Sequence, residues 1–170
     1  MLNKKQFLDH VIRTALEFLE PEIPHTVEAE QILMGTALQE SRLTYLVQIR
    51  GPALGVFQME PATHDDIWAN VLKYRQALGE KIHFEFASTY RTPVGPVRTA
   101  MADRMATDML YAAVMCRLQY FRWPEALPRK DDLQGQARMW KRRYNTFKGA
   151  GTVEEYLDKA VKRDVMTLWT

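Results

Sequence analysis

The sequence has little of what marks secreted disulfide-rich, membrane-spanning or nucleic-acid-binding proteins. Its single cysteine, Cys116, excludes a disulfide within the chain, and the apolar run that begins at Ala112 predicts a core position for it. No run of about eighteen apolar residues occurs, so we expect no membrane-spanning helix and no stable membrane insertion. The net charge of +2 is too weak to indicate a nucleic-acid partner.

The chain also has no internal repeat, no low-complexity tract and no recognisable signal peptide. Lys4 and Lys5 open the N-terminal stretch, but Asp9, His10 and Arg13 interrupt any apolar segment there. We therefore expect synthesis in the cytoplasm. A content of 46% hydrophobic and 26% charged residues is that of an ordinary globular protein. The length of 170 residues fits a single domain over residues 1–170, and we expect a monomer.

What is present is helical periodicity along most of the chain. Apolar residues recur every three or four positions, which predicts helices over residues 4–20, 26–41, 61–78, 98–120, 131–146 and 152–162. Ile82, Phe84 and Phe86 alternate with polar residues, which favours a short strand, and residues 92–96 have the composition of a turn-rich loop. The expected fold is mainly α with at most a small β element.

The helix over residues 26–41 ends on a carboxylate, Glu40. Glu40 continues the apolar stripe of this helix, whereas Glu28, Gln31 and Gln39 fall on the side expected to face solvent. Burial and the carbonyl end of the helix both disfavour the charged form, so the pKa of Glu40 should be raised, as a general acid requires. The alternative is a rim carboxylate that is solvated or paired with Arg42 or Arg50.

A glycine-spaced turn follows this helix. Gly51 and Gly55 allow backbone conformations that other residues avoid, and Gln58 would supply a neutral donor and acceptor near the acid. Pro61 suits the first turn of the next helix. The segment could equally be a structural turn between two helices.

Together these residues resemble a known signature. Glu40-Ser41, followed by Gly51-x-x-x-Gly55-Val-Phe-Gln58-Met-Glu-Pro61-x-Thr63, is similar to the motifs of lytic transglycosylases and goose-type lysozymes, particularly phage-encoded members. Tyr144-Asn145 resembles their third motif, Ala-Tyr-Asn. The chain departs from the family in four places. It lacks the Asn-Pro after the Glu-Ser pair, has Val56-Phe57 for Leu-Met, has Glu60 where an apolar residue is more common, and has Arg143 for the alanine.

The resemblance implies a lysozyme-like fold and cleavage of the β-1,4 bond between N-acetylmuramic acid and N-acetylglucosamine in peptidoglycan. Glu40 would be the general acid and then the base, with a 1,6-anhydro product in the transglycosylase version. Ser41 would orient the acid. The expected substrate-binding residues are Ser41, Gly55, Phe57, Gln58, Tyr144 and Asn145, with Gly55 letting a sugar ring approach the backbone.

A hydrolytic version would need a second carboxylate to hold water, at roughly 6.5–9.5 Å from the acid in inverting enzymes. Glu60, Asp65 and Asp66 are the candidates, and the sequence does not choose among them. His64, Asp65 and Asp66 also invite a metal interpretation, but consecutive helical positions point in different directions. We therefore expect neither a metal nor a cofactor.

The expected partner is the peptidoglycan glycan strand, reached after release through a membrane pore, packaging in a virion or secretion. Basic residues on one side of the helix over 131–146 would be solvated or would assist association with an anionic polymer: Arg138, Lys141, Arg142 and Arg143. Two other functions stay open. One is a non-catalytic lysozyme-like domain in a virion or on the cell wall, and the other is a related glycosidase acting on chitin.

Overall fold

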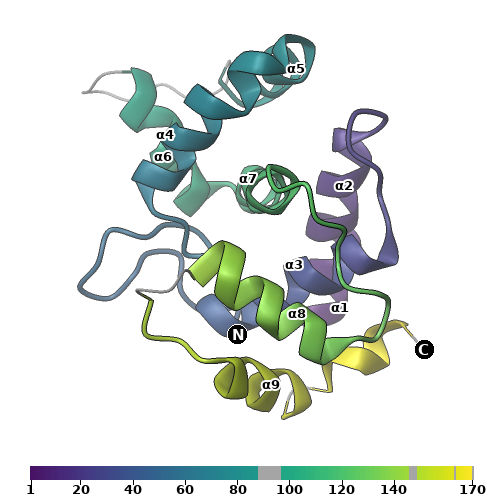
Figure 1. The fold of residues 1–170 in the computed structure, drawn as a ribbon. Coiled ribbons are helices and arrows are strands. Elements are labelled where there is room, and N and C mark those ends of the chain that lie inside the picture. Colours follow the sequence, from purple (N-terminus) through teal and green to yellow (C-terminus); the bar gives the residue numbers. More distant parts are fainter. Residues whose placement is uncertain (88–96, 146–148, 163, 170) are drawn as a thin grey trace.

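The regular structure of this computed structural model is helical almost throughout (Figure 1). The structure describes residues 1–87, 97–145, 149–162 and 164–169. The helices are α1 (Lys4–Phe7), α2 (Arg13–Leu19), α3 (Val27–Glu40), α4 (Pro61–Asn70), α5 (Gln76–Ala87), α6 (Val97–Thr107), α7 (Met109–Phe121), α8 (Leu133–Trp140) and α9 (Val153–Val161). Short 3₁₀ and π turns accompany them: η1 (Leu8–Ile12), η2 (Leu72–Tyr74), η3 (Lys141–Asn145) and η4 (Val165–Trp169).

Helix α7 lies at the centre of the molecule, and Figure 1 shows the other helices around it. Every residue from Tyr111 to Tyr120 is buried. The sequence predicted one long helix over 98–120, but the chain forms α6 and α7 instead. The break is at Asp108, whose extended backbone ends one helix and whose carboxylate accepts the Tyr111 N–H at 3.0 Å to cap the next.

Helix α3 packs against α7, α8 and α9. It begins within one residue of the predicted start, and Thr26 is its N-cap. Because neighbours surround it, residues 29–39 are all buried. The expectation that Gln31 and Gln39 face solvent is therefore wrong. The Gln31 side chain instead binds Asp131 through both its amide atoms at 2.9 Å, so a buried amide joins α3 to the segment before α8.

A glycine allows α3 and α9 to approach closely. A Cβ at Gly35 would lie 1.8 Å from the Tyr156 hydroxyl oxygen, so no other residue fits without displacing that ring. Helix α9 starts with a capping box, in which Thr152 and Glu155 bind each other's backbone N–H groups.

The predicted strand at 82–86 is wrong, because these residues belong to α5. Ile82 and Phe86 are four positions apart and share the buried face, whereas Phe84 is 78% exposed. The helix predicted over 61–78 ends at Asn70, and η2 separates it from α5. The predicted loop at 92–96 lies outside the described residues.

A small β element is present in the connection between α3 and α4. Leu54 pairs as an isolated bridge with both Val47 and Met59, which closes a tight turn around Gly55. Cys116 is buried in the core, as predicted. Among the helices that the structure describes, none is long and apolar enough to cross a membrane.

Candidate active site

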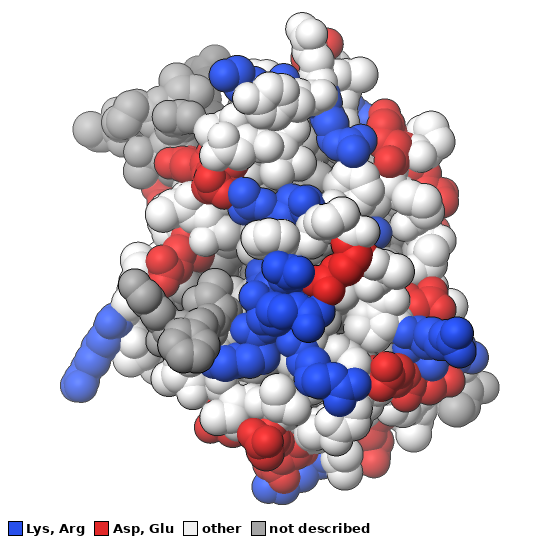
Figure 2. Space-filling view, viewed as in Figure 1, with Lys and Arg blue, Asp and Glu red and all other residues white. Residues whose placement is uncertain are grey.

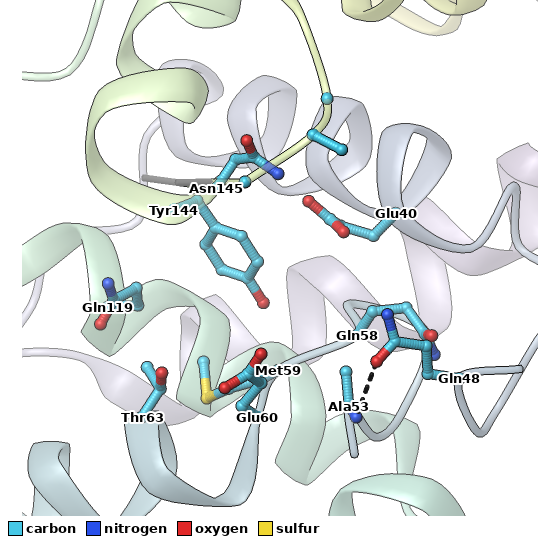
Figure 3. A pocket seen from close by; sticks show the side chains of 13 residues that line it. Glu40, Gln48, Ala53, Gln58, Met59, Glu60, Thr63, Gln119, Tyr144 and Asn145 are labelled. Atoms are coloured by element: carbon cyan, nitrogen blue, oxygen red, sulfur yellow. Dashed lines mark hydrogen bonds between the residues drawn. The ribbon is translucent and has the colours of Figure 1, made fainter. Parts of the chain in front are cut away.

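A cavity of about 390 Å³ opens where the end of α3 meets the α3–α4 connection, η3 and residues 149–151 (Figure 3). Two carboxylates line it, Glu40 and Glu60. Four side-chain amides line it as well: Gln48, Gln58, Gln119 and Asn145. No Lys or Arg of the described residues is among the lining side chains. The cavity therefore suits a neutral ligand rich in hydroxyl and amide groups.

Glu40 is the last residue of α3 and is partly buried at the edge of this cavity. The Trp140 indole N–H donates a hydrogen bond of 2.7 Å to its Oε1. Lys159 also lies near Glu40, because its Nζ donates a hydrogen bond of 2.9 Å to the carbonyl of the preceding residue, Gln39. The partner of Glu40 is thus an indole, whereas Arg42 and Arg50 are exposed, so the interpretation of Glu40 as an arginine-paired rim residue is not supported.

The acid has an altered proton affinity. Burial raises the pKa of Glu40 from 4.5 to about 7, although the Trp140 hydrogen bond and the Lys159 charge both oppose the rise. The predicted raised pKa is therefore confirmed, with burial as its main cause. A carboxyl group that is half protonated near neutral pH can both give and take a proton there.

Ser41 fixes the end of α3 and lies away from the cavity. Its buried hydroxyl donates to the Val56 carbonyl at 2.6 Å and accepts the Leu43 N–H at 3.1 Å. The expectation that Ser41 contacts substrate is therefore wrong. It holds the backbone that carries Glu40 against the start of the next segment.

Gly55 and Phe57 are also structural. Gly55 has a φ of 72°, and a Cβ there would lie 2.3 Å from the Met105 carbonyl oxygen, so its backbone approaches α6 and not a ligand. Phe57 is 1% exposed and packs against Phe7. The expectation that both residues bind substrate is therefore wrong, because neither lines the cavity and both pack against the protein itself.

Three predicted substrate-binding residues do line the cavity. Figure 3 shows Tyr144 and Asn145 from η3 directed toward the space that Glu40 faces, with Gln58 on the facing connection. The Tyr144 hydroxyl donates to the Phe57 carbonyl at 2.9 Å, and its ring stacks on Tyr120. Tyr144 therefore positions the α3–α4 connection, while Gln58 and Asn145 present amide groups to a ligand.

The three candidates for the second carboxylate lie in different places relative to the cavity. Glu60 lines the cavity, and Figure 3 shows it across the space from Glu40. Asp65 instead hydrogen-bonds His64 at 3.0 Å and borders a different hollow. Asp66 pairs with Arg122 and accepts from Asn70 at 2.6 Å. Asp65 and Asp66 are therefore wrong as candidates, because α4 directs both away from Glu40.

The sequence interpretation missed Trp140, Gln119 and Gln48. Trp140 follows Glu40 by 100 residues, so no local pattern links the two. One signal did exist. Trp140 lies four positions before Tyr144 and so faces the same way along the helix. Within the described part of the chain, no group of three or more His, Cys, Asp or Glu side chains could hold a metal ion.

The basic side predicted for residues 131–146 is visible in Figure 2, where Lys and Arg side chains gather over α8. Much of this charge is already paired. Arg142 and Arg143 both bind Glu125, and Lys141 donates to Asn145 and to the Gly149 carbonyl. Arg138 is exposed. The surface is therefore less cationic than its sequence indicates.

Comparison with known proteins adds no family assignment. No protein-family model, no curated protein and no solved structure matches this chain.

Proposed function

We propose that this protein is a lysozyme-like glycosidase that cleaves the β-1,4 bond between N-acetylmuramic acid and N-acetylglucosamine in peptidoglycan. The observation that carries the proposal is a single acid with a pKa of about 7, Glu40, facing a cavity lined by four amides. N-acetylated sugars are neutral at their ring and acetamido groups, and amides can bind both the acetamido and hydroxyl groups.

Bond cleavage would begin with protonated Glu40. Its proton passes to the glycosidic oxygen as the bond to the anomeric carbon breaks, so the acid becomes a carboxylate. The Trp140 N–H then stabilises that charge through the bond it already makes to Oε1. Gln58 and Asn145 would hold the sugar in place, since both line the cavity beside Glu40.

Two routes could complete the reaction. In the transglycosylase route, the Glu40 carboxylate takes the proton of the muramic C6 hydroxyl, which attacks the anomeric carbon and gives a 1,6-anhydro sugar. The Glu40-Ser41 and Gln58 motifs favour this route, and it needs no second carboxylate. In the hydrolytic route, Glu60 would activate a water molecule. Its place across the cavity from Glu40 favours this alternative.

A non-catalytic role in a virion or on the cell wall is the second candidate. It would keep the fold and the amide-lined cavity while leaving Glu40 unused. The raised pKa speaks against it, because a buried carboxyl group is unfavourable and tends to be retained where it has a use. A glycosidase acting on chitin would use the same cavity, so only substrate comparison separates it.

The test is clearing of purified peptidoglycan by the wild type and by Glu40→Gln, with mass spectrometry of the released sugars and chitin as a second substrate. The amide of this variant can still accept the Trp140 hydrogen bond but cannot give a proton, so we expect a loss of about 10³-fold or more. Wild-type protein that folds and clears no wall would contradict the proposal.

Glu60→Gln is the matched variant that separates the two routes. With the transglycosylase route, it keeps most of the activity and the products are lighter by one water. With the hydrolytic route, it loses activity nearly as fully as Glu40→Gln, and the products have reducing ends.

A further inference from the structure

Most of the exposed large apolar side chains of this protein come from two short segments that contact each other. Ten large hydrophobic residues are exposed in the part of the chain that the structure describes, and six of them come from two short segments. We call these six the apolar tip: Met1, Leu2, Tyr45, Leu46, Val47 and Ile49. An exposed cluster of this kind marks an interaction site, because single exposed apolar residues are normally scattered.

The two segments of the apolar tip are joined. The Leu2 N–H donates to the Leu43 carbonyl at 3.0 Å, and Met1, Leu2 and Leu46 line one shallow groove. The loop itself is held by backbone bonds, from Gly55 to Leu46 at 2.8 Å and from Gln48 to Ala53 at 2.9 Å. The side chains are therefore presented outward by a fixed backbone.

Positive charge accompanies the apolar tip along the chain. Residues 1–8 and 41–59 contain no Asp or Glu, and their basic residues are Lys4, Lys5, Arg42 and Arg50. The whole chain has a net charge of +2, so the remaining residues carry two more acids than bases. Lys5 pairs with Asp9 at 2.5 Å, so Arg42 and Arg50 contribute more of the net positive charge beside the apolar tip.

The two arginines also have an unusual backbone. Arg42 and Arg50 have φ values of 55° and 61°, where glycine or asparagine would be less strained. Both side chains are exposed and lie on either side of Tyr45 to Ile49 in the sequence. Leu43 and Gln58 of the same connection also have positive φ values, so this backbone belongs to the connection, and the arginines are distinguished by their exposed charge.

A surface that combines apolar side chains, a tyrosine and flanking arginines matches the interface of an anionic bilayer. A second copy of this chain fits less well, since a two-fold contact would bring the same cations together. The other cationic surface, over α8, has one exposed large apolar side chain, Trp123, which lies under Arg143. Its Arg142 and Arg143 are already paired with Glu125.

We propose that the apolar tip, with Lys4, Lys5, Arg42 and Arg50, docks this protein on the surface of an anionic lipid bilayer. The apolar side chains would enter the headgroup region while the cations bind lipid phosphates. Because Gln48 and Ala53 of the same loop line the cavity, docking would hold the cavity beside the membrane. This inference goes beyond the proposed glycosidase activity and does not depend on it.

The experiment is co-sedimentation of the full chain with vesicles of phosphatidylglycerol and phosphatidylcholine, and with vesicles of phosphatidylcholine alone. We expect binding to the anionic vesicles only, weakened by salt. Leu46→Ser/Ile49→Ser and Arg42→Glu/Arg50→Glu should each weaken binding by about tenfold or more. Glu40→Gln should bind as the wild type does, so loss of wall clearing and loss of docking are separate results.

Matched variants elsewhere on the surface serve as controls. Tyr74→Ser/Phe84→Ser removes similarly exposed apolar area from η2 and α5, and Arg138→Glu/Arg142→Glu reverses two charges on α8 and η3. Both should leave vesicle binding unchanged. The proposal is overturned if the wild type ignores anionic vesicles or if only the α8 variant loses binding. It is also overturned if light scattering shows a dimer that Leu46→Ser/Ile49→Ser dissociates.

Discussion

At the scale of single residues, the Trp140 hydrogen bond should tune the acid. The indole N–H favours the charged form of Glu40 and so lowers a pKa that burial has raised. Trp140→Phe should therefore raise the pKa of Glu40 and move the alkaline limb of the wall-clearing profile to higher pH. Because Trp140 is fully buried, the variant should also lose about 1–3 kcal/mol of unfolding free energy. The pH dependence of clearing and a thermal melt measure the two effects.

Trp169→Phe is the matched control for this prediction. Trp169 also donates its indole N–H to a buried carboxylate, Glu30, at 2.6 Å, but Glu30 does not line the cavity. Its loss should destabilise the fold and leave the pH profile in place. If Trp140→Phe left the alkaline limb of the wall-clearing profile at the same pH, the indole hydrogen bond would not determine the pKa of Glu40.

The sequence predicted Glu40 as the acid but did not predict the residues that lie around its carboxyl group. Glu40 could be found because helical spacing and a helix end are local properties. Trp140 and Lys159 could not, since both come from helices at least 100 residues later. Trp140 binds Glu40 itself, and Lys159 binds the neighbouring Gln39 carbonyl. Gly55 and Phe57 were misjudged for the same reason. A glycine such as Gly55 allows close approach of a ligand or of another part of the chain, and the sequence alone does not show that α6 packs there.

At the scale of helices, Gly35 controls how closely α3 and α9 pack. An alanine in a helix is normally more stable than glycine by about 1 kcal/mol. At Gly35 the new Cβ would meet the Tyr156 hydroxyl, so Gly35→Ala should instead cost about 1–3 kcal/mol in a denaturation experiment. Gly79→Ala in α5 is the control, because its Cβ would have no contact closer than 3.4 Å and should be tolerated.

Tyr156→Phe tests the same contact from the other side. The Tyr156 hydroxyl is buried, with no hydrogen-bond partner in the described part of the protein. Its removal should therefore leave stability unchanged or raise it slightly, and it should recover part of the loss in Gly35→Ala. A Gly35→Ala protein as stable as the wild type would show that α9 can move away at no cost.

Helix boundaries were predictable where a cap marked them. Thr26 and Thr152 begin α3 and α9 as expected, because their hydroxyls satisfy backbone N–H groups. Asp108 is also a cap, but it sits inside a continuous periodic pattern and was missed. At residues 82–86, alternating residues fit a strand and a helix alike over so short a run, and tertiary packing chose the helix.

At the scale of the whole molecule, stability should depend on pH through two carboxyl groups whose pKa values shift in opposite directions on folding, the buried Glu30 and the partly buried Glu40. Burial alone would raise the pKa of Glu30, but hydrogen bonds from Arg13, Trp169 and His25 outweigh it and hold that pKa below its usual value. Glu30 therefore stabilises the fold above its ordinary pKa, and this contribution is lost in acid. Glu30→Gln should cost about 3 kcal/mol at pH 7, measured by denaturant unfolding.

Glu40 acts in the opposite direction. Its pKa rises from 4.5 to about 7 on folding, so between these values the folded protein binds more protons than the unfolded chain. Stability must then fall as pH rises through this window. Glu40→Gln removes the titrating group, so its unfolding free energy relative to the wild type should grow by about 3 kcal/mol from pH 4 to pH 8. Denaturant unfolding at both pH values measures this change. A difference that stayed constant with pH would mean that Glu40 titrates as a solvated carboxyl group, and the general acid of the proposed reaction would be lost with it.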